Sequence, residues 1–262
     1  MIVNRLWQHH FGTGLVATPS DFGAQGGAPS HPELLEWLAG ELVRGGWKLK
    51  PIHRLIVESA VWRQSSGRVG PSDEVDPRNR LLSRYERRRL DAEAIRDTLL
   101  SLSGALDPTM GGRAGGDDTS PRRSLYLDVK RSRPSPFLRA FDAPDRVTGQ
   151  GARAITTTAP QSLLLMNAPA VRGWAERFAA RVVAEPFHFA DGVPTDDLAP
   201  IHTAYARALG RSPTPEELAD ARAFLEAQTA RYRADGRADA AAVALADFCQ
   251  VLLGLNETLF LE

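Results

Sequence analysis

The sequence predicts a mainly α-helical fold, an irregular multi-helix domain with a small β-strand or hairpin element near residues 124–130. Three observations lead to this prediction. Apolar residues recur at helical spacing along most of the chain, segments rich in Gly and Pro separate these stretches, and strand-like alternation occurs at one place. With 262 residues, of which 43% are hydrophobic, the chain is long enough to bury a hydrophobic core.

The predicted helices combine an apolar stripe with signals that start or stop a helix. Ser30 precedes Glu33 by three residues, which is the spacing of a capping box, and Gly45 can end the helix that follows. Thr214 and Glu217 repeat the same spacing near the carboxy terminus. We predict helices over residues 3–11, 30–45, 51–64, 91–106, 137–141, 160–166, 169–184, 201–209, 214–232 and 245–255.

The strand prediction rests on one segment. Leu125, Leu127 and Val129 alternate with polar or amphipathic residues, as in a strand with one buried face. The prolines that follow this segment predict irregular structure.

The formal net charge of zero hides an uneven distribution. Residues 78–153 contain 16 basic and 10 acidic residues (net +6), whereas residues 182–262 contain 6 basic and 13 acidic residues (net −7). Either these parts dock against each other, or the basic part binds an anion, or both are mixed solvated surface. A loop near residues 186–194 predicts a main helical domain at 1–185, with the β element, and a helical subdomain at 186–262 packed on it.

Composition argues against several classes of protein. The balanced charge and the acidic carboxy-terminal part argue against a nucleic-acid binder. No apolar run reaches the roughly 18 residues needed to span a bilayer, so we predict no membrane span. Cys249, the single cysteine, can form neither an internal disulfide nor a cysteine-based metal site, and the histidines lack metal-binding spacing. We therefore predict no metal.

No motif identifies a reaction, because the chain has neither a nucleophile elbow nor a P-loop. The strongest candidates for ligand binding are arginines, which form bidentate hydrogen bonds with carboxylate, phosphate or sulfate groups. A structural Arg–Asp network, or contact with an upstream domain, would use the same residues. The candidate ligand-binding residues are His9, His10, Asp21, His31, Arg87, Arg88, Arg89, Asp91, Arg122 and Arg123.

Four of the five tryptophans fall within the first 62 residues: Trp7, Trp37, Trp47 and Trp62. Their spacing with Leu and Ile predicts core positions, whereas exposed indole rings could stack on sugar rings.

Long motifs, in order along nearly the whole chain, resemble a known family. They lie at residues 3–16, 30–39, 55–59, 76–82, 87–97 and 122–126. The chain resembles the planctomycete domain of unknown function 1553. The resemblance implies the carboxy-terminal part of a large extracytoplasmic protein, preceded by a c-type cytochrome-like domain and another uncharacterised domain. Haem c is implied for the upstream part only, because this chain has no Cys-x-x-Cys-His motif.

Helical spacing at the first residues fits this interpretation, and we expect the chain to be a segment of a longer protein. We predict an accessory or ligand-binding domain that packs on the upstream domain and helps to bind a polysaccharide or another anionic ligand. The alternative is an extracytoplasmic enzyme that acts on such a substrate. Asp21 and Asp91 would then serve as acid and base if folding places their carboxylates about 5–10 Å apart.

Overall fold

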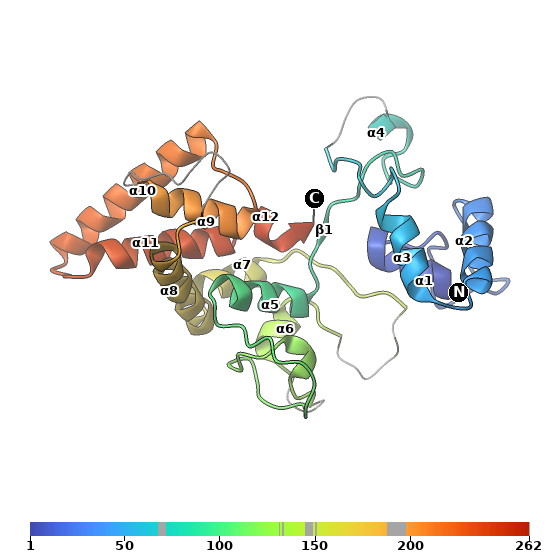
Figure 1. Ribbon diagram of the computed structural model, residues 1–262, viewed down its shortest axis with the longest axis horizontal. Helices are drawn as coiled ribbons and strands as arrows, with labels where there is room; N and C mark the ends of the chain where they lie inside the picture. Colours follow the sequence, from blue (N-terminus) through green and yellow to red (C-terminus); the bar gives the residue numbers. More distant parts are fainter. Residues whose placement is uncertain are drawn as a thin grey trace. The chain divides into compact units, whose positions relative to one another are not determined.

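The computed structural model describes residues 1–67, 72–130, 132, 134–144, 149, 151–187 and 198–261. These residues form many helices and one small antiparallel sheet, which confirms the predicted mainly α fold class (Figure 1). Contacts divide the chain into two compact units. Unit 1 comprises residues 1–89, 148–153 and 260–262, and unit 2 comprises residues 90–147 and 154–259.

Unit 1 is built around the contacts of its first three helices. Its elements are α1 (Ile2–Phe11), α2 (Pro32–Arg44), α3 (Leu49–Val57), α4 (Ser72–Val75), β1 (Arg88–Arg89) and β2 (Phe260–Leu261). The helices bury one apolar core, in which Trp7 stacks on Phe11 and Leu38, Leu42 and Ile52 close the other side. Each helix contributes residues three or four apart, as an amphipathic helix requires.

A buried asparagine fixes the chain where it leaves α1. The side chain of Asn4 donates to the carbonyl oxygen of Val16 (3.0 Å) and accepts from the Val16 backbone N–H (2.8 Å). The loop passes so close that a Cβ atom at Gly14 would lie 2.6 Å from Asn4 Nδ2. Only glycine fits there, and the loop is thereby held against α1.

Unit 2 is a larger helical assembly. Its elements are α5 (Ala92–Leu102), the 3₁₀ turn η1 (Ser124–Tyr126), α6 (Pro136–Ala140), α7 (Ala159–Asn167), α8 (Pro169–Ala184), α9 (Ala199–Leu209), α10 (Pro215–Ala234), α11 (Ala240–Leu253) and α12 (Asn256–Leu259). Helix α11 packs against both α8 and α10 (Figure 1). Phe178, Ile201 and Leu253 are fully buried in this core, as is Cys249, and burial raises the pKa of this thiol to about 12.

The capping-box prediction is confirmed at one of its two sites. Thr214 accepts a hydrogen bond from the Glu217 backbone N–H, and the Glu217 carboxylate accepts one from Thr214 N–H, so α10 begins as predicted. At α2 the prediction is wrong. The N-cap residue is His31, and Ser30 turns its hydroxyl to the carbonyl oxygen of Leu15 instead.

The small β element exists, but not where the sequence predicts it. β1 pairs antiparallel with β2, so Arg88 faces Leu261 and Arg89 faces Phe260. Residues 124–126 form η1 instead of a strand. Leu127 is buried while its alternating neighbours Leu125 and Val129 are exposed, so the alternation does not mark a continuous buried face.

The predicted boundary between residues 185 and 186 stays a prediction. Helices α8 and α11 lie on either side of it in the sequence, and both belong to unit 2. Residues 188–197, which contain most of the predicted linker, lie outside the described residues.

Candidate functional site

Two histidines from different helices meet in unit 1. His10 lies in the last turn of α1 and His53 lies in α3, and His10 Nε2 is 2.8 Å from His53 Nδ1. One imidazole therefore donates to the other. Trp62 packs edge-on against the His10 ring, with 5.1 Å between centroids, and the Tyr85 hydroxyl donates to the His10 carbonyl oxygen. With these aromatic neighbours, the imidazole rings of His10 and His53 are both partly buried.

Burial and basic neighbours act together on the first histidine of this pair, His10. Burial lowers the pKa of His10 below its usual value, and His53, Arg88 and His9 lower it further. No carboxylate among the described residues offsets these influences on His10. The α1 carboxy terminus supplies only about half a negative charge, against a full positive charge on Arg88.

Arg88 reaches this site from β1. Its Cδ atom lies 3.7 Å from the position that a Cβ atom would occupy at Gly12, the residue that ends α1. Its Nε atom is buried, and its side chain makes no hydrogen bond with any described residue. A buried guanidinium N–H without an acceptor can donate to an added anion.

The other candidates in unit 1 have different surroundings. Asp21 accepts from the Gly23 N–H through its carboxylate, and its carbonyl oxygen accepts from Thr18 Oγ1, so it closes a turn. His31 pairs through Nδ1 with Ser30 Oγ at 3.0 Å. His9 and Arg87 are exposed, whereas Arg89 is buried and interacts with its neighbours. The structure therefore brings His9, His10 and Arg88 together, and does not bring Asp21 or His31 into that group.

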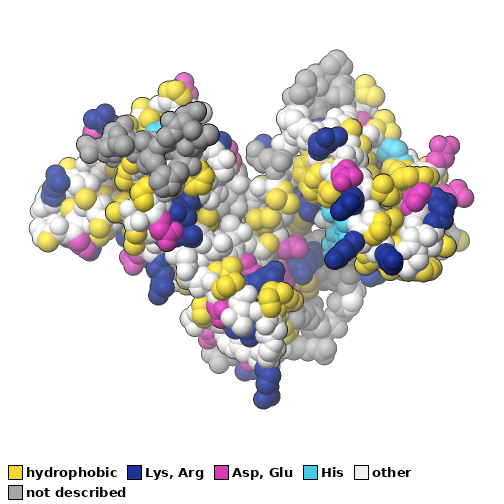
Figure 2. Space-filling view, in the orientation of Figure 1, with side chains coloured by type: hydrophobic (Ala, Val, Ile, Leu, Met, Phe, Trp, Pro, Cys, Tyr) yellow, Lys and Arg dark blue, Asp and Glu magenta, His cyan; other side chains and the backbone are white. Residues whose placement is uncertain are grey.

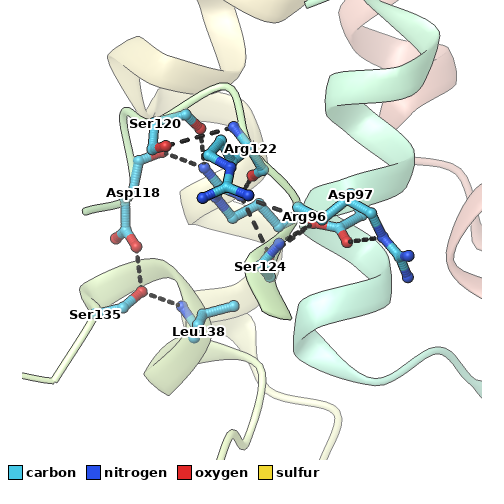
Figure 3. A network of polar contacts seen from close by, with 9 residues as sticks. Arg96, Asp97, Asp118, Ser120, Arg122, Ser124, Ser135 and Leu138 are labelled. Atoms are coloured by element: carbon cyan, nitrogen blue, oxygen red, sulfur yellow. Dashed lines mark hydrogen bonds and ion pairs between the residues drawn. The ribbon is translucent and has the colours of Figure 1, made fainter. Parts of the chain in front are cut away.

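Unit 2 uses its arginines to hold loops. Arg96 on α5 is fully buried, and its guanidinium donates to the carbonyl oxygens of Asp118, Ser120 and Arg122 and to Ser124 Oγ (Figure 3). Burial lowers the pKa of Arg96 from its usual value, although neighbouring aspartates oppose this shift. One side chain thus fastens the whole 118–124 loop to α5.

Two aspartates complete this network. Asp97 accepts from the backbone N–H and the hydroxyl of Ser124, both at 2.7 Å, and forms an ion pair with Arg123 at 3.6 Å. Asp118 accepts from the Ser135 hydroxyl and from the Phe137 N–H (3.0 Å), which ties the loop to the start of α6 (Figure 3). These contacts have the geometry of a structural Arg–Asp network.

Arg122 and Arg123, both predicted ligand-binding candidates, belong to this architecture. Arg122 donates to the carbonyl oxygens of residues 109, 111 and 113, and its guanidinium lies 4.2 Å from the centroid of the Tyr126 ring. Asp91 is the N-cap residue of α5 and interacts with neighbouring residues. It lies in unit 2, whereas Asp21 lies in unit 1.

Helix α2, the start of α3 and the turn between them expose large apolar side chains. Trp37 is 47% exposed and Trp47 is 66% exposed, with Val43 and Leu49 also at the surface. Trp47 has a φ angle of 62°, which is rare for a bulky residue. Figure 2 shows hydrophobic, basic and acidic side chains interspersed on the surface of unit 1. We call the side chains of Trp37, Val43, Trp47 and Leu49 the α2–α3 surface.

A pocket of about 490 Å³ lies between α8 and α11 in unit 2. Its charged lining residues are already paired. Arg172 contacts Glu176 at 2.9 Å and Asp247 at 2.5 Å, and Arg237 contacts Asp239 at 2.9 Å. This pocket therefore offers a small apolar floor of alanines and valines without an uncompensated charge.

Sequence reasoning missed His53 and the exposure of Trp37 and Trp47. The contact between His10 and His53 depends on how α1 packs on α3, and no motif spacing encodes it. His53 directly follows Ile52, which is buried in α3. This position beside a core residue was the one sequence signal that His53 could contact another helix. For the tryptophans, Trp7 lies in the core as predicted and Trp62 packs against it, whereas Trp37 and Trp47 do not.

No helix among the described residues is long and apolar enough to cross a membrane. Within the same residues, no group of three or more His, Cys, Asp or Glu side chains is placed to hold a metal ion.

Among three comparisons with known proteins, one found a match. Searches of curated proteins and of solved structures found no match. The model of a family described as a protein of unknown function (DUF1553) matches residues 1–225. This match covers both units and most of the chain. The family resemblance inferred from the motifs is therefore confirmed, and the chain belongs to the DUF1553 family.

Proposed function

We propose that this chain is a non-catalytic accessory domain that packs through the α2–α3 surface on a preceding domain of a longer, extracytoplasmic polypeptide. The observation that carries the proposal is the exposure of Trp37 and Trp47 beside a unit 1 core that is already complete. Exposed large apolar side chains of this kind are common at interaction sites in proteins. Tryptophan is also the residue type most enriched among interface hot spots.

The energy available at this surface is large enough for stable docking. Burying the exposed part of each indole ring would contribute about 2–4 kcal/mol, from the area of a tryptophan and the usual value per unit of apolar area. Trp47 also keeps a backbone conformation that costs energy in isolation. A contact made by this side chain would explain why the cost is tolerated.

The charge around the α2–α3 surface defines the partner. Arg44 and Arg54 pair with Glu41 and Glu58, whereas Lys48 and Lys50 beside Trp47 have no ion-pair partner among the described residues. The docking face of the preceding domain should therefore combine an apolar centre with an acidic rim. The location outside the cytoplasm and the preceding domain are supported by the family resemblance. Haem c belongs to the upstream part in this proposal, since Cys249 is buried and a second cysteine is lacking.

Hydrogen exchange tests the docking directly. Residues 43–50 should exchange at least 10-fold more slowly in the longer natural polypeptide than in this chain alone. The Trp37→Ser, Trp47→Ser double variant should lose this protection. Val251→Ser, which changes an exposed apolar side chain on α11, is the matched control and should retain it. Equal exchange of residues 43–50 in the two wild-type polypeptides would contradict the docking.

A second experiment tests the accessory role. The longer polypeptide and this chain are screened for hydrolysis of polysaccharides, with the Arg88→Ala, Arg89→Ala double variant for comparison. We expect no turnover by this chain alone. Turnover that the double variant abolishes while remaining folded would replace the accessory role with the enzyme alternative.

A further inference from the structure

We propose that His10, His53 and Arg88 form a binding site for one oxyanion group, a carboxylate, sulfate or phosphate, on unit 1. The inference is independent of docking at the α2–α3 surface. It rests on three observations: the direct contact of two imidazoles, the lack of a nearby carboxylate, and an arginine side chain without hydrogen-bond partners among the described residues.

The imidazole pair can present donors without losing its own hydrogen bond. The contact uses Nε2 of His10 and Nδ1 of His53. The outer nitrogen atoms, Nδ1 of His10 and Nε2 of His53, therefore remain for bonding to a ligand. Neither remaining atom has a hydrogen-bond partner among the described residues. A neutral pair has two N–H hydrogens, one in the shared bond and one on an outer nitrogen. One added proton gives N–H donors on both outer nitrogens and leaves the shared bond in place.

An anion would supply what this cluster lacks. His10 on α1 contacts His53 on α3, and His53, Arg88 and His9 act on His10 with no acidic side chain among these influences. A bound oxyanion accepts from the guanidinium of Arg88 and from the imidazole donors, and its charge favours protonation of the pair. Binding is therefore coupled to uptake of a proton as the pH falls toward the ordinary pKa of histidine.

A metal ion is the competing occupant of two adjacent imidazoles. Histidine binds zinc through neutral nitrogen atoms, and such sites are usually completed to four ligands by other His, Cys, Asp or Glu side chains. No third side chain of this kind is in place among the described residues. Arg88 beside the pair also repels a cation, so the observations favour an anion.

The experiment titrates the whole chain with sodium sulfate, and separately with phosphate and acetate, at constant ionic strength in sodium chloride. Ring ¹⁵N resonances of His10 and His53 report protonation, and calorimetry reports affinity. We expect saturable binding, a rise in the apparent pKa of the pair, and tighter binding at pH 6 than at pH 8. The three anions distinguish which oxyanion class fits best.

Variants identify the residues that bind. Arg88→Gln and His53→Gln should each weaken binding about 10-fold or more, because each removes a charge-assisted hydrogen bond. Arg87→Gln is the matched control, since Arg87 directly precedes β1 and its side chain is exposed. Arg88→Lys, which keeps the charge, should bind with intermediate affinity. Circular dichroism verifies that each variant is folded.

Three results would overturn the proposal. The first is the absence of a saturable change in the His10 and His53 resonances with any of the three anions. The second is equal weakening by Arg87→Gln and Arg88→Gln in folded protein. The third is tight binding of Zn²⁺ by the pair in a chain that binds no anion.

Discussion

Arg88 of unit 1 differs from the loop-holding arginines of unit 2 in the acceptors that its guanidinium group finds. In unit 2, Arg96 and Arg122 donate to backbone carbonyl oxygens, and Arg172 is paired with two carboxylates. In unit 1, Arg88 lies beside two histidines and makes no side-chain hydrogen bond with the described residues. Neighbouring acceptors therefore decide whether an arginine is structural or available to a ligand, and sequence clustering does not.

The difference extends to the apolar residues. In unit 2, helix α11 buries Leu252, Leu253 and Phe248 between its neighbours. In unit 1, α2 and the turn that follows it leave two indole rings, Trp37 and Trp47, largely in solvent. The same unit thus contains both the incompletely bonded arginine and the exposed aromatic surface, which makes unit 1 the place to seek binding.

The largest effect is expected from Arg96→Met. This change removes four hydrogen bonds and leaves buried carbonyl oxygens of the 118–124 loop without donors, so we expect unfolding to become easier by about 3–4 kcal/mol. Urea denaturation measures the loss. Hydrogen exchange should locate it in α5, η1 and α6 of unit 2.

Arg222→Met provides the surface control for this prediction. Arg222 is exposed and pairs with Glu226 one helical turn away, so its loss should cost less than about 1 kcal/mol. If the two variants lose similar stability, the network around Arg96 does not hold the loop.

Asn4→Ala is the corresponding test in unit 1. Asn4 is fully buried, and both polar atoms of its side chain bond to the backbone of Val16. Removing them leaves a buried N–H and a buried carbonyl group unpaired, and we expect a loss of about 2 kcal/mol. Thermal unfolding measures it, with Asn167→Ala as an exposed control. A loss no greater than that of the control would show that the loop is not fixed by Asn4.

Local patterns predicted the helices better than the contacts between them. Periodicity suffices for α2, and periodicity with a capping box suffices for α10, because each depends on neighbouring residues. The strand prediction failed at residues 125–130 because a strand needs a partner, and β1 and β2 pair across about 170 residues of chain. The proposed anion site uses two candidates that the sequence offered, His10 and Arg88, while His53 enters only through the packing of α1 on α3.

Acid should affect the two units in different pH ranges. Hydrogen bonds from Arg211 and Thr214 lower the pKa of Glu217 from 4.5 to about 2. The stability from this ion pair is therefore present above pH 4.5 and lost as the pH falls toward 2. The side chain is one-third exposed, so solvent screening reduces the contribution to about 1 kcal/mol.

In unit 1 the loss of folding stability on acidification should begin at higher pH. The pKa of His10 is lowered below 6.5, so the unfolded chain takes up a proton first, and stability falls as the pH drops below 6.5. Hydrogen exchange on acidification should thus show α1 and α3 opening before α9 and α10. Glu217→Gln keeps the capping geometry and should remove only the change in unit 2. Simultaneous loss in both units would contradict this assignment.

The smallest expected effect separates stability from binding at the α2–α3 surface. Asparagine adopts positive φ more readily than tryptophan, and Trp47 has a φ angle of 62° with most of its side chain in solvent. Trp47→Asn should therefore stabilise the isolated chain by about 0.5 kcal/mol, measured by urea denaturation. The same change removes an exposed anchor and should weaken docking to the preceding domain in the longer polypeptide.

Trp37→Asn, within a helix, should weaken docking without stabilising the chain. If Trp47→Asn destabilised the isolated chain, the Trp47 side chain would be needed for the folding of unit 1. The exposure of its indole ring would then not be evidence for a docking partner.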